Sequence, residues 1–427
     1  MASIERLYEL YRRFPNVQTD TRKLQPGDLF FALKGPNFNG NTFVQKALEA
    51  GAGACVIDEK EYVVEGKTFL VDDALEALQE LARHHRSRFE IPFLAITGSN
   101  GKTTTKELIH AVLSAHYRTY TTEGNLNNHI GVPLTLLKIR DDAEYAVIEM
   151  GANHQKEIAS YCRVALPTHG LITNCGKAHL EGFGGEEGVR KGKGELFDHL
   201  RATGGTAFVM WDYGYLRDMS KGIVELVTYG TADAGIEGVA VQSDPFLEVA
   251  FHKGFEGTVR TQLVGSYNLP NVLAAVAVGT HFGVPPEKIR AALEAYHPSN
   301  SRSQLVQKGS NRIILDAYNA NPSSMKLAVE NFARTAGDDK VLVLGAMAEL
   351  GTESQKEHAA LAGLIGNYSW KEVLLVGGDF QKIDHPYRRF NSATEAGEWL
   401  RAQSLQGTSL LVKGSRSTGM EKVLDYL

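Results

Sequence analysis

Several features are scarce in this chain of 427 residues, and each scarcity excludes a class of protein. The three cysteines are widely spaced and form no C-x-x-C pair, so we expect neither a disulfide framework nor a zinc site. No apolar run reaches the roughly 18 residues of a membrane span, and charges interrupt residues 1–14. We therefore expect no membrane segment, no signal peptide and a reducing, cytoplasmic location.

An excess of positive charge is also missing. Lysine and arginine number 45 against 50 acidic residues, a net charge of −5, so no broad positive field is available for a nucleic-acid backbone. We expect no nucleic-acid partner. Hydrophobic residues at 43% and charged residues at 22% are typical of a globular protein with sizeable cores. The length predicts two to four domains, with three as the central expectation.

Proline and small polar residues near positions 92 and 298 mark two breaks in the chain. Before the first break, apolar runs and one helical pattern predict a small α/β unit. Between the breaks, runs such as FLAIT and YAVIE alternate with helical patterns, which predicts a mostly parallel sheet, with antiparallel strands within about 224–264. The phosphate-loop motif described below makes this sheet one of the P-loop ATPase type. Four further runs predict a C-terminal, Rossmann-like sheet. The predicted fold class is α/β, with domains of residues 1–91, 92–300 and 301–427.

The stretch AITGSNGKTTTKE, residues 95–107, joins a predicted strand to a predicted helix. Its glycines expose backbone N–H groups, the helix N-terminus attracts anions, Lys102 reaches terminal phosphates and Thr103 ligates Mg²⁺. The alternative, a glycine turn capped by threonines, explains Gly98 but not the Gly-Lys-Thr at the helix start. The stretch therefore predicts a nucleotide site formed by Gly98, Ser99, Asn100, Gly101, Lys102, Thr103 and Thr104.

Polar residues also follow the ends of other predicted strands. Glu149 ends YAVIE and Asp316 ends RIILD, at the carboxyl edge where ligands and hard cations collect. A surface carboxylate at a strand end is the alternative for Glu149. His179 lies in a loop after a third strand, where a solvated histidine is the alternative.

Lys193 lies in the run GVRKGKGELF beside Arg190 and Lys191. Crowded cations lower the pKa of a lysine, and a neutral amine can capture CO₂ as a carbamate. A basic, solvated helix face is the alternative for such a run.

Asparagines cluster in two places. The first cluster occupies a glycine-flanked loop, where uncharged donors and acceptors suit a sugar nucleotide and a turn role is the alternative. The second brackets Pro270 at a helix start, where an N-cap role is the alternative for its first member. The residues are Asn125, Asn127, Asn128, Asn268 and Asn271.

The shortened loop spacing G-S-N-G-K-T resembles that of the Mur ligase family and its folate-ligase relatives. Further motifs in the order of that family extend the resemblance along nearly the whole chain. They are EGNLNNHIGVPLTLL (123–137), IEMGANHQKEI (148–158), ITNCGKAHLEGFGG (172–185), GSYNLPNVLAA (265–275), DAYNANPSSM (316–325), LGAMAELG (344–351) and LVKGSR (411–416).

The resemblance implies an ATP-dependent ligase that forms an amide bond through an acyl phosphate. Its implied substrates are UDP-N-acetylmuramoyl-tripeptide and D-alanyl-D-alanine, in cytoplasmic peptidoglycan precursor synthesis, with ATP and Mg²⁺ as cofactors. One domain would hold the uridine nucleotide, one ATP and one the amine. We expect a monomer.

The resemblance also assigns roles to single residues. The implied catalytic residues are Lys102, Lys193, His179 and Arg302, and the implied Mg²⁺ ligands are Thr103, Glu149, His179 and Lys193 as its carbamate. Beyond the phosphate loop, the implied ATP contacts are Asn271 on adenine, Asp316 on ribose and Arg302 on the γ-phosphate. The implied substrate contacts are Thr21, Arg22, Asn125, Asn127, Asn128, Tyr318, Asn319, Asn321, Lys413, Ser415 and Arg416.

Three places depart from the family pattern. Asn39-Gly40-Asn41 stands where the family has Asp-Gly-His, and Leu315 and Ala346 stand where it has aspartates.

Three alternative functions remain. A ligase adding the third amino acid typically shows D-N-P-R, which this chain lacks, and Y-A-H-x-P where this chain has YNANP. A folate polyglutamate ligase lacks the uridine-binding domain, and a nucleotide-binding module without catalysis would not need Lys193 or His179.

Overall fold

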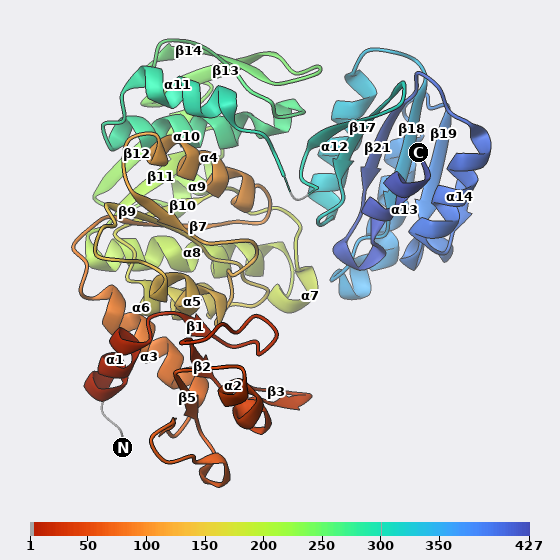
Figure 1. Ribbon diagram of the computed structural model, residues 1–427. Helices are drawn as coiled ribbons and strands as arrows, with labels where there is room; N and C mark the ends of the chain where they lie inside the picture. The colour runs from red at the N-terminus through yellow and green to blue at the C-terminus, as the bar shows by residue number, and fades with distance from the viewer. Residues whose placement is uncertain (1–3, 300) are drawn as a thin grey trace.

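The computed structural model describes residues 4–299 and 301–427, so the predicted boundary at residue 300 lies outside the described residues. Three domains, each with its own main sheet, follow one another along the chain (Figure 1). The predicted α/β class is confirmed. None of the helices within the described ranges is long and apolar enough to cross a bilayer.

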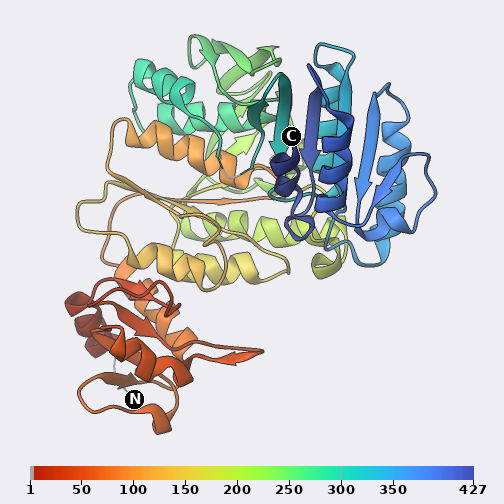
Figure 2. The ribbon, with the colours of Figure 1, turned by 45° about the vertical axis from the view of Figure 1, so that its right-hand side comes forward.

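The N-terminal domain has a four-stranded parallel sheet in the order β1-β2-β5-β6. Its central strands are the apolar runs LFF and ACVI, which are buried throughout. A small β3–β4 hairpin projects from it (Figure 2). The elements are α1 (Ile4–Arg13), β1 (Val17–Gln18), β2 (Leu29–Phe31), β3 (Lys34–Gly35), β4 (Phe38–Asn39), α2 (Val44–Glu49), β5 (Ala54–Ile57), β6 (Thr68–Leu70) and α3 (Ala74–Arg86).

The middle domain is built on a nine-stranded sheet in the order β15-β14-β13-β12-β11-β10-β7-β9-β8. Its strands are β7 (Phe93–Thr97), β8 (Thr119–Thr121), β9 (Tyr145–Glu149), β10 (His169–Ile172), β11 (Thr206–Met210), β12 (Glu225–Gly230), β13 (Ile236–Gln242), β14 (Glu248–Lys253) and β15 (Gly257–Arg260). Its helices are α4 (Lys102–Ser114), α5 (Gly131–Leu137), α6 (Glu157–Ala165), α7 (Leu180–Phe183), α8 (Glu186–Thr203), α9 (Gly214–Met219), α10 (Leu269–His281) and α11 (Pro286–Ala295).

The sheet is parallel from β8 to β13, and only the β13–β14–β15 edge is antiparallel. The prediction of antiparallel strands was therefore wrong for β12, which pairs in parallel with β11 and β13. Helices α4 and α10 lie on one side of the sheet and α8 on the other (Figure 1).

The register of three neighbouring strands positions the site. Ile96 of β7 pairs with Glu149 of β9, and Thr97 pairs with Ile172 of β10. Three strands therefore end at one level of the sheet edge. The loop after β7, the carboxylate of Glu149 and the segment after β10 start side by side, although they are far apart in the sequence.

The C-terminal domain has a six-stranded sheet in the order β16-β17-β21-β18-β19-β20. Alternate residues of its central strands pack into two cores, one on each face. The sequence predicted four of these strands but not β16 and β20, because QLVQK and RRF are short, polar edge strands. The elements are β16 (Gln304–Lys308), β17 (Asn311–Asp316), α12 (Pro322–Arg334), β18 (Lys340–Gly345), α13 (Ser354–Ile365), β19 (Glu372–Val376), β20 (Arg388–Phe390), α14 (Ala393–Gln403) and β21 (Ser409–Lys413).

Helix α3 joins the N-terminal domain to the middle domain, because it packs against α5 and α6. Near its end the guanidinium of Arg86 is buried and donates to the carbonyls of Ala165, Leu166 and Phe89 at 2.8–2.9 Å. It also lies 3.6 Å from the ring centre of Phe93. Arg86 thus satisfies carbonyls at the end of α6, which would otherwise be buried without donors.

We predict that Arg86→Met lowers the thermal midpoint by about 5 °C or more, because it leaves buried carbonyls without donors. Methionine keeps most of the apolar length of arginine, so a lower midpoint reports the loss of the hydrogen-bond donors. Arg83→Met, an exposed change on the same helix, is the control. Differential scanning calorimetry checks the difference, and equal midpoints for the two variants would contradict this role of Arg86.

Candidate functional site

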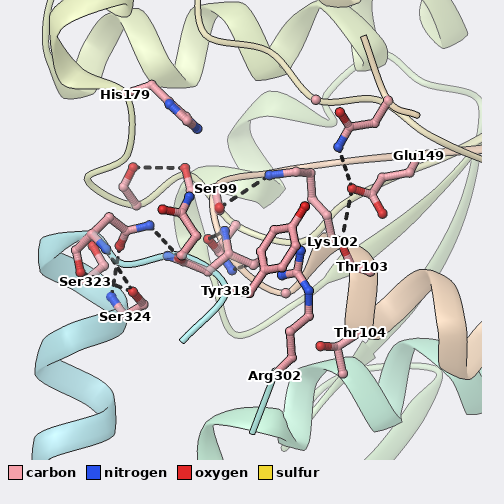
Figure 3. Close-up of a pocket in the computed structure, with 18 of the residues that line it drawn as sticks. Ser99, Lys102, Thr103, Thr104, Glu149, His179, Arg302, Tyr318, Ser323 and Ser324 are labelled. Atoms are coloured by element: carbon pink, nitrogen blue, oxygen red, sulfur yellow. Dashed lines mark hydrogen bonds between the residues drawn. The ribbon is translucent and has the colours of Figure 1, made fainter. Parts of the chain in front are cut away.

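A cavity of about 820 Å³ opens between the middle and C-terminal domains. The phosphate loop, the ends of β9 and β10, and the loops after β17 and β21 line it. Figure 3 shows side chains from both domains around this space. The cavity thus brings together most of the residues that the sequence predicted for the site.

Two glycines give the phosphate loop its shape. Gly98 has φ 144°, and a Cβ there would lie 1.9 Å from Oγ1 of Thr173. Gly101 has φ 80° and precedes the first residue of α4, and a Cβ there would lie 2.7 Å from Oδ1 of Asn271. Both the backbone angles and the close neighbours require glycine. The first residues of α4 consequently line the cavity, and the free N–H groups of a helix start are suited to an anion.

The segment after β10 holds this loop from behind. The N–H groups of Ser99 and Asn100 donate to the backbone and side-chain oxygens of Asn174, at 2.9 and 3.1 Å. Thr173 donates its hydroxyl to the carbonyl of Asn100 at 2.6 Å, and Ser99 donates to the carbonyl of Gly176 at 2.9 Å. The loop is therefore preorganised by contacts that the sequence did not predict.

Lys102 folds back over the loop that precedes it. Its ammonium donates to the carbonyl of Gly98 at 2.7 Å (Figure 3). Burial lowers its pKa, the nearby Glu149 carboxylate raises it and the Arg302 guanidinium lowers it further. Two cations thus approach one another at the loop, an arrangement that a bound polyphosphate would neutralise.

Glu149 lies 1% exposed beside the loop. Its Oε1 accepts from Thr103 at 3.2 Å and from Asn127 at 2.7 Å, whereas the buried Oε2 has no hydrogen-bond partner within the described ranges. The described residues contain no group of three or more His, Cys, Asp or Glu side chains suited to a metal. One free carboxylate oxygen beside a hydroxyl still fits Mg²⁺, which takes few protein ligands and completes its shell with phosphate oxygens and water.

Lys193 lies behind the cavity wall rather than on it. It is 1% exposed, donates to the carbonyl of Ala152 at 2.9 Å and lies 4.9 Å from the ring centre of Phe183. Its pKa is lowered well below the ordinary value by burial first and by the charge of Lys102 second. The lowered pKa of Lys193 agrees with the sequence prediction. The predicted cause, crowding by Arg190 and Lys191, was wrong, because burial and Lys102 lower the pKa instead. Arg190 and Lys191 lie on the exposed face of α8.

The predicted asparagines all line the cavity, but several are already engaged. Asn127 orients Glu149, and Oδ1 of Asn128 accepts from two N–H groups at the start of α5. Asn271 accepts from Thr105 at 3.0 Å and donates to Asn268, which donates to the carbonyl of Val264. Asn268 makes no side-chain N-cap bond. Asn125 is exposed, so its amide is available to a ligand.

Two arginines lie against the ring of Tyr318. The guanidinium of Arg302 lies 3.6 Å from the ring centre and that of Arg416 lies 5.4 Å from it. The Nε of Arg302 is buried and has no hydrogen-bond partner in the part of the chain that is described. Figure 3 shows Arg302 and Tyr318 side by side next to the phosphate loop. Both arginines line the cavity and suit anionic ligands.

Lys413 and Ser415, predicted to hold a substrate carboxylate, are nearly fully buried. The ammonium of Lys413 pairs with Asp316, its register neighbour, at 2.5 Å, and Ser415 donates to the carbonyl of Ala320. Of these predicted anion-binding residues, only Arg416 is exposed.

The two predicted asparagines after β17 are engaged within the protein. Asn319 accepts from the N–H of Ala320. Asn321 caps α12 and donates to Asn100 at 2.7 Å across the domain boundary.

Thr21 and Arg22 do not line this cavity. They lie in the N-terminal domain, where the exposed Arg22 forms a bidentate pair with Asp20. Asn39 and Asn41, which depart from the family pattern, hydrogen-bond to each other and to the carboxylates of Glu59 and Asp58. Leu315 and Ala346 are buried in apolar surroundings, so their side chains offer no polar contact.

The sequence missed residues that link the two domains at the cavity. His179, as predicted, lines it, but its Nδ1 faces Oε2 of Glu349 in the C-terminal domain. Lys177 pairs with Glu357 of the same domain at 2.7 Å. Glu349 was visible within the motif LGAMAELG, but nothing in the sequence paired it with His179.

Comparisons with known proteins match all three domains. The family description "Mur ligase family, catalytic domain" matches residues 13–86, "Mur ligase middle domain" matches 96–279, and "Mur ligase, glutamate ligase domain" matches 301–416. The UDP-N-acetylmuramoyl-tripeptide–D-alanyl-D-alanine ligases of Bacillus subtilis and Escherichia coli are 35% and 36% identical to this chain. Each alignment covers 96% of this chain and 92% or 93% of the relative.

Solved structures agree with this match. The crystal structure of MurF from Acinetobacter baumannii has a TM-score of 0.87 at 30% identity, covering 98% of this chain and 97% of its own. MurF ligase from Thermotoga maritima in complex with ADP also has a TM-score of 0.87, at 27% identity, covering 100% and 98%.

We predict that Glu149→Gln weakens Mn²⁺ binding in the presence of ADP by about tenfold or more, because the free anionic oxygen is lost. Electron paramagnetic resonance of free Mn²⁺ measures the affinity. Glu157→Gln is the matched control, since Glu157 lines the same cavity but is occupied by the N–H groups of Asn153 and His154. Equal affinities for the two variants would remove Glu149 from the cation site.

Proposed function

Because the chain belongs to the Mur ligase family, we propose that it joins D-alanyl-D-alanine to the terminal carboxylate of UDP-N-acetylmuramoyl-tripeptide. It is an ATP-dependent, ADP-forming ligase of peptidoglycan precursor synthesis. The observation that carries the proposal is the cavity between the domains, whose lining includes both the phosphate loop and the exposed Arg416. ATP and the incoming amine can therefore meet in one space.

The proposed phosphoryl step uses residues that line the cavity. The carboxylate oxygen of the tripeptide attacks the γ-phosphorus, the bond to ADP breaks, and an acyl phosphate forms. Negative charge would develop near the N–H groups at the start of α4, the ammonium of Lys102 and the guanidinium of Arg302, all of which line the cavity. Preorganised donors of this kind supply most of the catalysis in phosphoryl transfer.

Mg²⁺ would be held by Glu149 and Thr103, with His179 and a carbamate on Lys193 as further ligands. Bound there, the ion would neutralise charge on the phosphates. The unpartnered Oε2 of Glu149 supports its place. The low pKa of Lys193 favours the neutral amine that reacts with CO₂, a reaction that releases one proton as the carbamate forms.

The second step takes place on the side of the C-terminal domain. The free amine of D-alanyl-D-alanine, after losing its proton, attacks the acyl carbon and phosphate leaves. Arg416 is the residue we assign to the dipeptide carboxylate, because Lys413 is occupied by Asp316. Docking of the domains keeps water from the acyl phosphate, which water would otherwise hydrolyse.

The finer assignments form part of the same proposal. Asp316 and Asn271 contact the ribose and adenine of ATP, Asn125 contacts the sugar nucleotide, and Thr21 and Arg22 hold the uridine diphosphate. The protein acts as a monomer in the cytoplasm, where ATP and UDP-linked precursors are available.

Purified protein should release phosphate from ATP only when UDP-N-acetylmuramoyl-tripeptide and D-alanyl-D-alanine are both present. Mass spectrometry of the product should show the added dipeptide. Lys102→Met should lower the rate about 100-fold or more, because it removes a cation from the transferring phosphoryl group. Product formed with UDP-N-acetylmuramoyl-dipeptide and a single amino acid instead would favour the ligase of the preceding step.

Lys193→Ala should be nearly inactive, and acetate or formate should restore part of the activity by replacing the carbamate. Lys191→Ala on the exposed face of the same helix should keep full activity. Steady-state phosphate release measures both variants. Full activity of Lys193→Ala without any added carboxylate would refute the carbamate.

A further inference from the structure

Residues 176–179, which we call the docking segment, connect the phosphate loop to the C-terminal domain. The carbonyl of Gly176 accepts from Ser99 in the loop. On the other side, the N–H of Lys177 donates to Oγ of Ser323 at 3.0 Å, and its ammonium pairs with Glu357. The segment therefore contacts the nucleotide site and the partner domain at once.

His179 ends this segment in an unusual conformation. Its φ is 52°, and that of Glu349, which faces it, is 61°. Left-handed backbone is costly for residues other than glycine and is found where the surroundings enforce it, often at functional sites. Two such residues thus face each other across the boundary between the domains.

The contact between His179 and Glu349 uses one particular nitrogen. Nδ1 is buried against Oε2 of Glu349, although the pair lacks the alignment of a regular hydrogen bond. Such contacts commonly tighten when substrates bind. The ring also lines the cavity, and among the described residues Nε2 makes no hydrogen bond. Nε2 is consequently the nitrogen left for a ligand.

The loop that carries Glu349 is held in place by its own domain. The N–H of Met347 donates to Nε2 of His358 at 3.0 Å, and the N–H of Ala348 donates to Oγ of Ser415 at 2.9 Å. Glu349 therefore moves with the C-terminal domain. Its carboxylate reaches His179 only when that domain is docked.

We propose that Glu349 is a positioning residue that makes the nucleotide site complete only when the C-terminal domain is docked. Its carboxylate faces Nδ1 of His179 and accepts the Nδ1–H proton; whenever the imidazole is neutral it carries one N–H, so Nε2 is then unprotonated toward the cavity. An unprotonated nitrogen can ligate a cation or accept a hydrogen bond. The inference rests on the proposed function for the identity of that ligand, but not for the tautomer.

The pair Lys177–Glu357 provides a matched control. It joins the same segment to the same domain, but it does not touch the imidazole. Removing it takes away one ion pair but leaves the hydrogen bonds from Lys177 N–H to Ser323 and from Asn321 to Asn100, so the domain stays docked and Glu349 stays against His179. Glu349→Ala and Glu357→Ala thus separate orientation of the ring from the loss of one ion pair between the domains.

The test uses the full chain labelled with ¹⁵N-histidine, with ADP and at one fixed pH. Long-range ¹H–¹⁵N spectra report the tautomer of each histidine. The signal that is missing in His179→Gln belongs to His179. We expect the Nδ1–H form in the wild type and in Glu357→Ala, and the Nε2–H form in Glu349→Ala. Glu349→Gln should keep the wild-type form, since its amide oxygen still accepts.

Two further measurements complete the test. In Glu349→Ala the affinity for Mn²⁺ with ADP should fall about 10- to 100-fold, and kcat should fall similarly while KM for the dipeptide stays within about twofold. Glu357→Ala should raise that KM instead. An unchanged tautomer and Mn²⁺ affinity in Glu349→Ala, or the same tautomer change in Glu357→Ala, would overturn the proposal. If the wild type formed no amide product, that result would refute the proposed function alone.

Discussion

The phosphate loop keeps its shape because the segment after β10 occupies its polar backbone groups. Asn174 accepts from two consecutive N–H groups of the loop, and Thr173 donates to the next carbonyl. This support exists because β7 and β10 are parallel neighbours that end at the same level. The loop and the docking segment depend on that register, and the free carboxylate of Glu149 depends on the matching register of β7 with β9.

The charges around the cavity fall into two groups. Some are satisfied by the protein itself, as Lys413 is by Asp316 and Glu157 is by the N–H groups of Asn153 and His154. Others keep one buried atom without a hydrogen-bond partner among the described residues, as Oε2 of Glu149 and Nε of Arg302 do. An unpaired buried charge costs free energy, so it persists where a ligand supplies the missing partner. The unsatisfied atoms therefore outline where a cation and a polyphosphate would lie.

Particular residues show how far the sequence predicts the site. The glycines and Lys102 were predicted because a phosphate loop is local in sequence and needs a fixed spacing. Lys193 was predicted with the correct direction of its pKa shift but the wrong cause, since the sequence cannot show which face of a helix is buried. Asn128 and Lys413 were assigned to substrates, and these assignments stay predictions, although both side chains also bond within the protein. Glu349 was missed because its partner is 170 residues away.

The sequence by itself determined the α/β class, the three domains, the phosphate loop and the strand-end carboxylates. Each of these depends on periodicity or spacing within a short stretch, which the chain carries without folding. Only the tertiary structure decided that β12 is parallel, that Lys193 is buried beside Lys102 and that His179 faces Glu349. These features depend on contacts between distant segments, and strand register and domain docking bring those segments together.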